Sequence, residues 1–234
     1  MTLKRIALLI PAALALAAGT AYADGQPAKG PFAGAVHASV AITYQDGSQQ
    51  TWTVDGGRIT ALSASSLTLT RRDRTQVSFA ITSSTIVRSG GATYGLSDLK
   101  VGLAAQVVSQ NGAADIVRNL RGDGAPDGGD PSAIDGPLAK SVTGTVDAQY
   151  VDGSSQSFEY DRAVITAADN GQLTVKRADG KQLTLSYSDS TLVRDCKGQH
   201  TNLAVGDGGD FFSQNGAVAL AGCVHQMRRT RPQA

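Results

Sequence analysis

Apolar and polar residues alternate with a period of two through much of the chain. The first alternating segment places five apolar side chains on one face of an extended strand: Val36, Ala38, Val40, Ile42 and Tyr44. Turn sequences such as Asp46-Gly47, Asp55-Gly56-Gly57 and Asn111-Gly112 separate this run from later ones. Asx-Gly between alternating runs favours a β-hairpin. The pattern therefore predicts an all-β protein made of short strands joined by tight turns.

The second half of the chain repeats the first at an offset of 106 residues. Tyr44, Asp46-Gly47-Ser48 and Gln50 recur at Tyr150, Asp152-Gly153-Ser154 and Gln156. After a two-residue deletion the offset becomes 104, which places Ser109-Gln110-Asn111-Gly112 on Ser213-Gln214-Asn215-Gly216. Such a register over a long stretch indicates an internal duplication. We expect repeats over residues 34–121 and 142–228, each with about seven strands.

Each repeat has too few apolar residues for a two-sheet sandwich, so a small closed or nearly closed β-barrel is the favoured architecture. Residues 122–141 contain five Gly, three Pro and four Asp. That composition is typical of a solvated linker. Residues 24–33 are interpreted as a flexible lead-in, and residues 229–234 as a tail. The predicted fold is thus two tandem barrels joined by a Gly/Pro/Asp-rich linker.

The N-terminus has the pattern of a secretory signal peptide. Lys4 and Arg5 precede an apolar stretch of 13 residues from Ile6 to Ala18, and Ala21-Tyr22-Ala23 supplies small residues for cleavage. A membrane-spanning helix needs about 20 residues, so this stretch is too short to be one. We expect residues 1–23 to be removed and the mature protein to be secreted or otherwise extracytoplasmic, in a periplasm or at a cell surface, with no transmembrane segment.

Composition excludes several protein classes. Of 20 acidic residues only Glu159 is Glu, and the chain has 27 Gly, which disfavours a helical bundle or a coiled coil. After loss of Lys4 and Arg5, 19 basic residues face 20 acidic ones. A balance so close to neutral gives no overall attraction to nucleic acid, and none is expected as a partner.

Several turn motifs resemble those of a known family. They read Arg177-Ala178-Asp179-Gly180-Lys181, Ser190-Thr191-Leu192-Val193-Arg194 and Leu203-Ala204-Val205-Gly206-Asp207. The sequence resembles the domain-of-unknown-function repeats, small and OB-like, of secreted bacterial proteins. The resemblance implies a fold and a location, and no activity. The first repeat departs from it at the hairpin tip, where Arg74 stands in place of Gly180.

The two cysteines, Cys196 and Cys223, both lie in the second repeat. In an exported protein an even pair of cysteines favours a disulfide. An alternative is a metal site in which His200 and His225 join the two thiolates, since Cys-x3-His and Cys-x-His supply four ligands. Both interpretations remain open from the sequence, with the disulfide preferred.

Catalytic motifs are not found. The sequence lacks a Gly-x-Ser-x-Gly elbow, a His-Glu-x-x-His motif and a Gly-x-x-x-x-Gly-Lys loop, so no catalytic residue and no cofactor are predicted. The remaining histidine, His37, lies on the polar face of the first strand without a visible acid–base partner. Glu159 is interpreted as a solvent-facing residue, and the Asp clusters as turn residues.

Basic residues gather at two places. Arg71, Arg72 and Arg74 crowd one hairpin tip, and Arg228 and Arg229 lie near the C-terminus. They suggest contact with an anionic envelope polymer or with another protein. The preferred function is therefore a non-catalytic binding or cell-envelope-associated module. Two alternatives are an extracellular hydrolase with a site between the barrels and a metal-binding protein.

Overall fold

The computed structural model describes residues 31–89, 92–119, 140–195 and 199–226. We call residues 31–119 the N-terminal half and residues 140–226 the C-terminal half. The strands of the N-terminal half are β1 (Ala35–Tyr44), β2 (Gln49–Leu62), β3 (Ser66–Arg71), β4 (Gln76–Ala80), β5 (Ile86–Ser89), β6 (Ala92–Tyr94), β7 (Ala104–Gln110) and β8 (Ala113–Asn119). Those of the C-terminal half are β9 (Ser141–Tyr150), β10 (Ser155–Asp169), β11 (Gln172–Arg177), β12 (Gln182–Ser186), β13 (Leu192–Asp195), β14 (Asp207–Gln214) and β15 (Ala217–Gln226).

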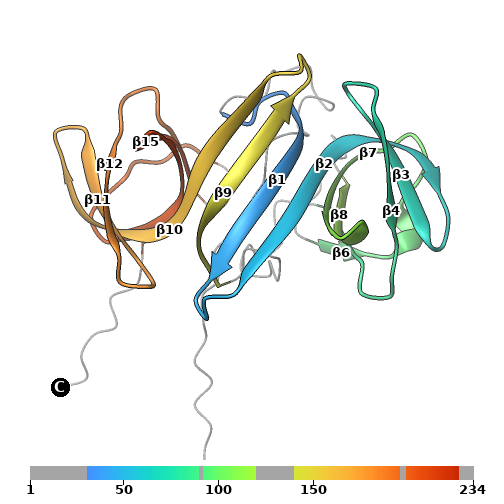
Figure 1. The fold of residues 1–234 in the computed structure, drawn as a ribbon, viewed down its shortest axis with the longest axis horizontal. Coiled ribbons are helices and arrows are strands. Elements are labelled where there is room, and N and C mark those ends of the chain that lie inside the picture. Colours follow the sequence, from blue (N-terminus) through green and yellow to red (C-terminus); the bar gives the residue numbers. More distant parts are fainter. Residues whose placement is uncertain (1–30, 90–91, 120–139, 196–198, 227–234) are drawn as a thin grey trace, which may run out of the picture.

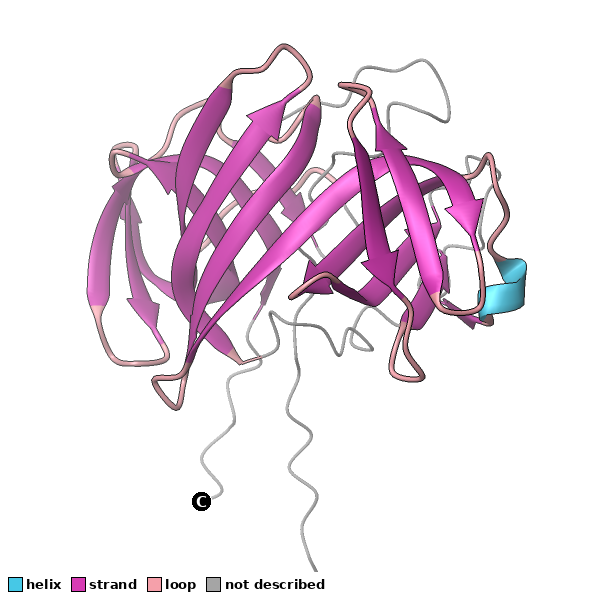
Figure 2. Ribbon diagram, turned by 45° about the vertical axis from the view of Figure 1, so that its right-hand side comes forward, coloured by secondary structure: helices cyan, strands magenta, loops and turns pink. Residues whose placement is uncertain are grey.

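The predicted all-β fold is confirmed. The only helical element of the described residues is a short 3-10 turn, η2 (Leu96–Asp98), drawn in cyan in Figure 2. The predicted signal peptide (1–23) and tail (229–234) lie outside the described residues, as does most of the predicted linker.

Each half forms a ring of five strands. In the N-terminal half, β2 pairs with β3, β3 with β4, β8 with β7, and β7 with β2, while a short parallel contact between β4 and β8 closes the ring. In the C-terminal half, β10, β11, β12, β15 and β14 close in the same way. The two rings lie at opposite ends of the molecule (Figure 1).

The rings are joined by a continuous sheet. β1 and β9 pair with each other in antiparallel fashion, and their outer neighbours are β2 and β10, so the order β2-β1-β9-β10 runs across the middle of the molecule (Figure 1). We call these four strands the central sheet. β2 and β10 are long because the first part of each strand pairs within the central sheet and the last part pairs within its own ring.

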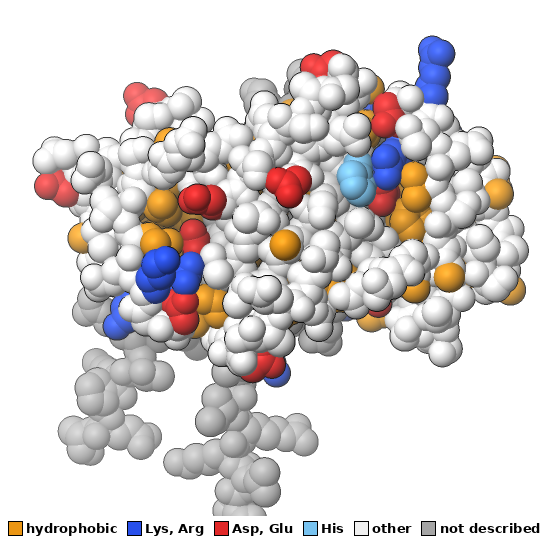
Figure 3. All heavy atoms as spheres, in the orientation of Figure 1, with side chains coloured by type: hydrophobic (Ala, Val, Ile, Leu, Met, Phe, Trp, Pro, Cys, Tyr) orange, Lys and Arg blue, Asp and Glu red, His pale blue; other side chains and the backbone are white. Residues whose placement is uncertain are grey.

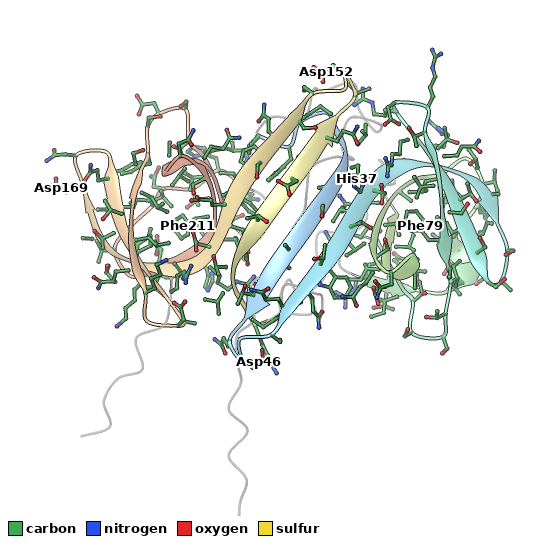
Figure 4. The ribbon with its side chains drawn as sticks, in the orientation of Figure 1. His37, Asp46, Phe79, Asp152, Asp169 and Phe211 are labelled. Atoms are coloured by element: carbon green, nitrogen blue, oxygen red, sulfur yellow. The ribbon has the colours of Figure 1, made fainter. Side chains whose placement is uncertain are left out.

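Three hydrophobic cores follow from this arrangement. One fills the N-terminal ring around Ile59, Leu67 and Phe79, and another fills the C-terminal ring around Ile165 and Phe211. The third, the central core, lies under the central sheet and takes residues from both halves: Phe32, Val40, Val54, Val108, Val146, Phe158, Tyr160 and Phe212. In Figure 4, Phe79 and Phe211 mark the two ring cores.

One predicted turn is wrong. Asp55-Gly56-Gly57 continues β2 and does not end it. A Cβ on Gly57 would lie 2.5 Å from the carbonyl oxygen of Thr70, so glycine here lets β3 pass close to β2. The glycines therefore mark a close approach between strands, where the long strand leaves the central sheet for the ring.

The predicted lead-in and linker are also shorter than expected at their described ends. Phe32 lies in the predicted flexible lead-in, yet it is buried in the central core. Ser141 lies in the predicted linker, yet it is buried at the start of β9. Both residues are held because the chain entering each half packs against the central sheet.

Candidate functional site

The side chains of the central sheet that point away from the central core form one polar face, which we call the outer face. Side chains alternate between the two faces of a strand, so these are the odd-numbered residues of the paired segments. They are Gln49, Thr51, Thr53 and Asp55 of β2, His37, Ser39, Ala41 and Thr43 of β1, Thr143, Thr145, Asp147 and Gln149 of β9, and Ser155, Ser157, Glu159 and Asp161 of β10.

Most of the outer face is uncharged. Figure 3 shows it toward the viewer, with side chains that are neither charged nor hydrophobic over most of the middle. Asp147 and Glu159 are its exposed acidic residues. The exposure of Glu159 agrees with its interpretation as a solvent-facing residue.

A hollow of about 300 Å³ lies on this face where β1, β2 and β9 run side by side. Its outward-pointing side chains are those of Ala41, Thr43, Gln49, Thr51 and Thr145. Ala41 is the smallest of the outward residues, and the equivalent position in the C-terminal half holds Asp147. The hollow thus offers hydroxyl and amide groups, and its lining contains no charged residue.

A buried ion pair stands at one corner of the outer face. The Asp55 side chain is 2% exposed and binds the guanidinium of Arg71, which reaches over from β3. Asp55 Oδ1 also lies 2.9 Å from His37 Nδ1, and Arg71 Nη2 lies 3.2 Å from the same nitrogen. Figure 4 shows His37 where β1 meets β2.

His37 therefore has an acid–base partner, contrary to the expectation from sequence. When Nδ1 carries the proton and donates it to Asp55, Nε2 is the acceptor of the ring. The side chain of His37 is 25% exposed. The arrangement supplies one oriented imidazole at the edge of the outer face.

The C-terminal half has an equivalent ion pair. Arg177 Nη1 lies 2.9 Å from Asp161 Oδ1, and the hydroxyl of Thr143, at the position equivalent to His37, donates to the same carboxylate oxygen at 2.9 Å. Arg177 also binds Asp179. Hydrogen bonding to Arg177 lowers the pKa of Asp179, and hydrogen bonding to Asp179 is the largest cause of the raised pKa of Arg177. This pair lacks the imidazole.

A second buried polar network uses side chains that the equivalent positions of the N-terminal half do not carry. The hydroxyl of Tyr160 donates to Asp210 Oδ1 at 2.9 Å, and Arg162 Nε donates to the same oxygen at 2.8 Å. Ser141 Oγ lies 2.8 Å from the Tyr160 hydroxyl. Burial raises the pKa of Asp210, and Arg162 offsets part of that rise. The equivalent residues of the N-terminal half are Val54, Gly56, Gln106 and Ala35.

The predicted arginine cluster is divided. Arg71 turns back to Asp55 and belongs to the ion pair, whereas Arg72 and Arg74 are exposed in and beside the turn between β3 and β4. Arg74 has a positive φ of 69°, matching the glycine conformation of Gly180 at 85°. Arg228 and Arg229 lie outside the described residues.

The cysteine predictions remain predictions. Cys196 lies outside the described residues, while Cys223 is buried in β15. His225 Nδ1 donates to the carbonyl oxygen of Cys223 at 2.9 Å, and His200 forms an isolated bridge with Arg194. Among the described residues no group of three or more His, Cys, Asp or Glu side chains is placed to hold a metal ion.

Sequence reasoning missed Asp55, Asp161 and Asp210 as buried residues. The offset of 106 that relates Arg71 to Arg177 also relates Asp55 to Asp161, so the ion pair is duplicated as a unit. That joint duplication was the available signal. No comparable signal marks Asp210, because its equivalent is Gln106.

Comparison with known proteins gives one match. Residues 56–114 match a family described as a domain of unknown function, DUF5666. No curated protein and no solved structure matches the chain. Within the described residues, no helix is long and apolar enough to cross a membrane. The matched segment begins inside β2, contains β3 to β7 in full, and ends at the second residue of β8.

Proposed function

We propose that this chain is an exported, non-catalytic binding protein of the cell envelope, built from two tandem OB-like barrels. The signal pattern of residues 1–23 supports export. The equivalent five-strand rings support two related barrels. In the same compartment Cys196 and Cys223 would be joined as a disulfide, and counting free thiols in the exported protein tests this pairing.

The ligand we propose is an uncharged, hydroxyl-rich polymer such as a glycan strand. The observation that carries this proposal is the hollow over Ala41, whose lining is rich in hydroxyl and amide groups. Such groups donate and accept hydrogen bonds with sugar hydroxyls. The outer face continues beyond the hollow with hydroxyl and amide side chains from both halves, such as Ser39 and Gln149, so it can accommodate a chain longer than one sugar.

Charge favours this ligand over an anionic polymer at the same place. The exposed charged residues of the outer face include Asp147 and Glu159, which would repel phosphate or carboxylate groups. The cations nearest the face, Arg71 and Arg177, are already bound to carboxylates. An anionic polymer remains a second candidate at Arg72 and Arg74, which are exposed beyond the end of β3.

Co-sedimentation with chitin, an insoluble and uncharged glycan, tests the proposal. The mature chain should bind, with little dependence on salt because no ion pair is involved. Ala41→Gln fills the hollow with a longer polar side chain. The equivalent position of the C-terminal half holds Asp147, so the sheet accepts a polar side chain longer than alanine there. We expect this variant to bind at least about tenfold more weakly.

Ser155→Gln is the matched control, since it makes the same new side chain on the outer face away from the hollow. Its binding should equal that of the unmodified protein. Absence of binding, or equal binding by Ala41→Gln, contradicts the glycan proposal. Binding to an anionic envelope polymer that fades with salt and is lost in Arg72→Ala/Arg74→Ala would support the anionic candidate instead.

A further inference from the structure

The pairing of β1 with β9 is symmetric in the sequence. Val40 lies opposite Val146, its own equivalent at the offset of 106. On either side, His37 lies opposite Gln149 and Thr43 lies opposite Thr143. The offset converts the first pair into the second, because Thr143 is the equivalent of His37 and Gln149 that of Thr43. The two halves are therefore related by an approximate two-fold axis at Val40 and Val146, as in a symmetric dimer.

Side chains cross this axis into the opposite half. Phe32 precedes β1, yet its ring packs edge-on against Phe158 and Phe212 of the C-terminal half, with centroid separations of 4.9 and 5.3 Å. The Tyr150 hydroxyl donates to the carbonyl oxygen of Pro31, and the backbone N–H of Gln45 donates to that of Lys140 at 3.2 Å. The contact between the halves thus has a hydrophobic centre and hydrogen bonds around it.

Separation of the halves would expose what this contact covers. β1 and β9 would each become an edge strand with an unpaired row of backbone groups, which readily pairs with another strand. The central core would be divided, because Val40 and Val54 come from one half and Val146 and Phe158 from the other. Exposed apolar area of this kind drives association.

We propose that each half carries a surface that recognises the other half without a covalent connection, so that its partner can equally come from a second copy of this chain. We call this the pairing surface; it comprises β1, β9, Phe32 and the aromatic residues that Phe32 contacts. The linker keeps the two halves together, and the pairing surface determines how they associate.

One position on the pairing surface has no room for a side chain. A Cβ at position 144 would lie 2.2 Å from the carbonyl oxygen of Ala41, and the residue there is glycine. The equivalent residue of the N-terminal half is Ala38. Ala38 stands at the symmetry-related position, opposite Ala148, and carries a Cβ there, so the contact between the halves is only approximately symmetric.

The test uses the full mature chain with a protease site inserted between Gly128 and Gly129 in the predicted linker. After cleavage we expect the two fragments to co-elute on size-exclusion chromatography at micromolar concentration. When cleaved protein is mixed with an excess of cleaved protein carrying a tag on one half, tagged and untagged halves should exchange. The uncleaved protein with the same insertion is the control for the insertion itself.

Phe32→Ala tests whether the pairing surface is responsible. Truncating a buried phenylalanine at the contact should raise the dissociation constant of the cleaved halves at least about 100-fold. The matched control is Phe79→Ala, since both phenylalanines are 3% exposed but Phe79 packs only within the N-terminal ring core. It should lower the melting temperature and leave the dissociation constant within about threefold.

Gly144→Ala provides a second variant, expected to weaken association at least about tenfold because its Cβ meets Ala41. Cleaved halves that separate as two folded monomers would overturn the proposal. Equal weakening by Phe32→Ala and Phe79→Ala would also overturn it, because association would then depend on general stability. Chitin binding by the uncleaved chain is measured separately, so failure of pairing and failure of the proposed function are distinguishable.

Discussion

Replacing Asp55 with Asn tests how strongly its ion pair with Arg71 stabilises the fold. The Asp55 and Arg71 side chains are 2% and 11% exposed, so water has little access to replace the lost partner. Removing one member of a buried ion pair leaves an uncompensated charge and costs about 3–5 kcal/mol. We expect about 3 kcal/mol, at the low end of this range, because His37 Nδ1 remains 3.2 Å from the guanidinium and can accept a hydrogen bond from it.

Urea unfolding followed by tryptophan fluorescence measures this loss. Trp52 is the only tryptophan, lies in β2 with Asp55, and packs against the central core. Its Nε1 donates to the Tyr44 hydroxyl at 3.2 Å, so the emission reports on the central sheet. The unfolding midpoint should fall while the slope with denaturant stays the same.

Asp161→Asn is the internal control. It breaks the equivalent pair, but Arg177 keeps Asp179 as a partner, so the loss of stability should be smaller than for Asp55→Asn. A loss below about 1 kcal/mol for Asp55→Asn would refute the reasoning, since that is the range of an exposed ion pair. Equal losses for the two variants would refute the role assigned to Asp179.

Two further predictions concern the turns and the bent strand. Hydrogen bonds from Ser48 and Ser154 lower the pKa of Asp46 and Asp152, respectively. These hydrogen bonds therefore stabilise the fold above the usual aspartate pKa of 3.8, and the stabilisation is lost as the pH falls through the lower pKa values of the folded state. The Asp46→Asn/Asp152→Asn variant should show a flatter acid limb in urea titrations from pH 5 to about 2, and an unchanged limb would contradict this. Gly57→Ala should cost about 1–3 kcal/mol in the same titration, because its Cβ meets the Thr70 carbonyl, and no loss would show that β3 can move away.

Local patterns in the sequence were sufficient to predict the strand class and the hairpins. The alternation from Val36 to Tyr44 is present in β1, and Asp46-Gly47 forms the turn that follows it. The alternation does not choose the partner of a strand. The alternation in β1 does not show whether the strand pairs with β9 or lies at an exposed edge of a sheet. The partner of a strand depends on contacts that form only in the folded chain.

The missed features also have physical causes. Asp55-Gly56-Gly57 has the composition of a turn, but here the glycine accommodates a crossing strand. Asp55 lies on the polar face by its period, and it is buried because Arg71 from another strand covers it. The offset of 106 already held one further clue: Gly30-Pro31-x-Ala33 recurs as Gly136-Pro137-x-Ala139, so the repeated unit begins before residue 34.

The two faces of the central sheet differ in how far the halves agree. Among eight equivalent pairs pointing inward, four are identical: Val36/Val142, Val40/Val146, Tyr44/Tyr150 and Gln50/Gln156. Among eight pointing outward, only Asp55/Asp161 is identical. The inward residues maintain an approximately symmetric frame, whereas the outer face is asymmetric. Its equivalent positions hold Ala41 and Asp147 in one case, and His37 and Thr143 in another. A ligand that lies over the hollow therefore meets a surface that occurs once per chain, and this favours one binding site for the whole molecule over two equivalent sites, one on each half.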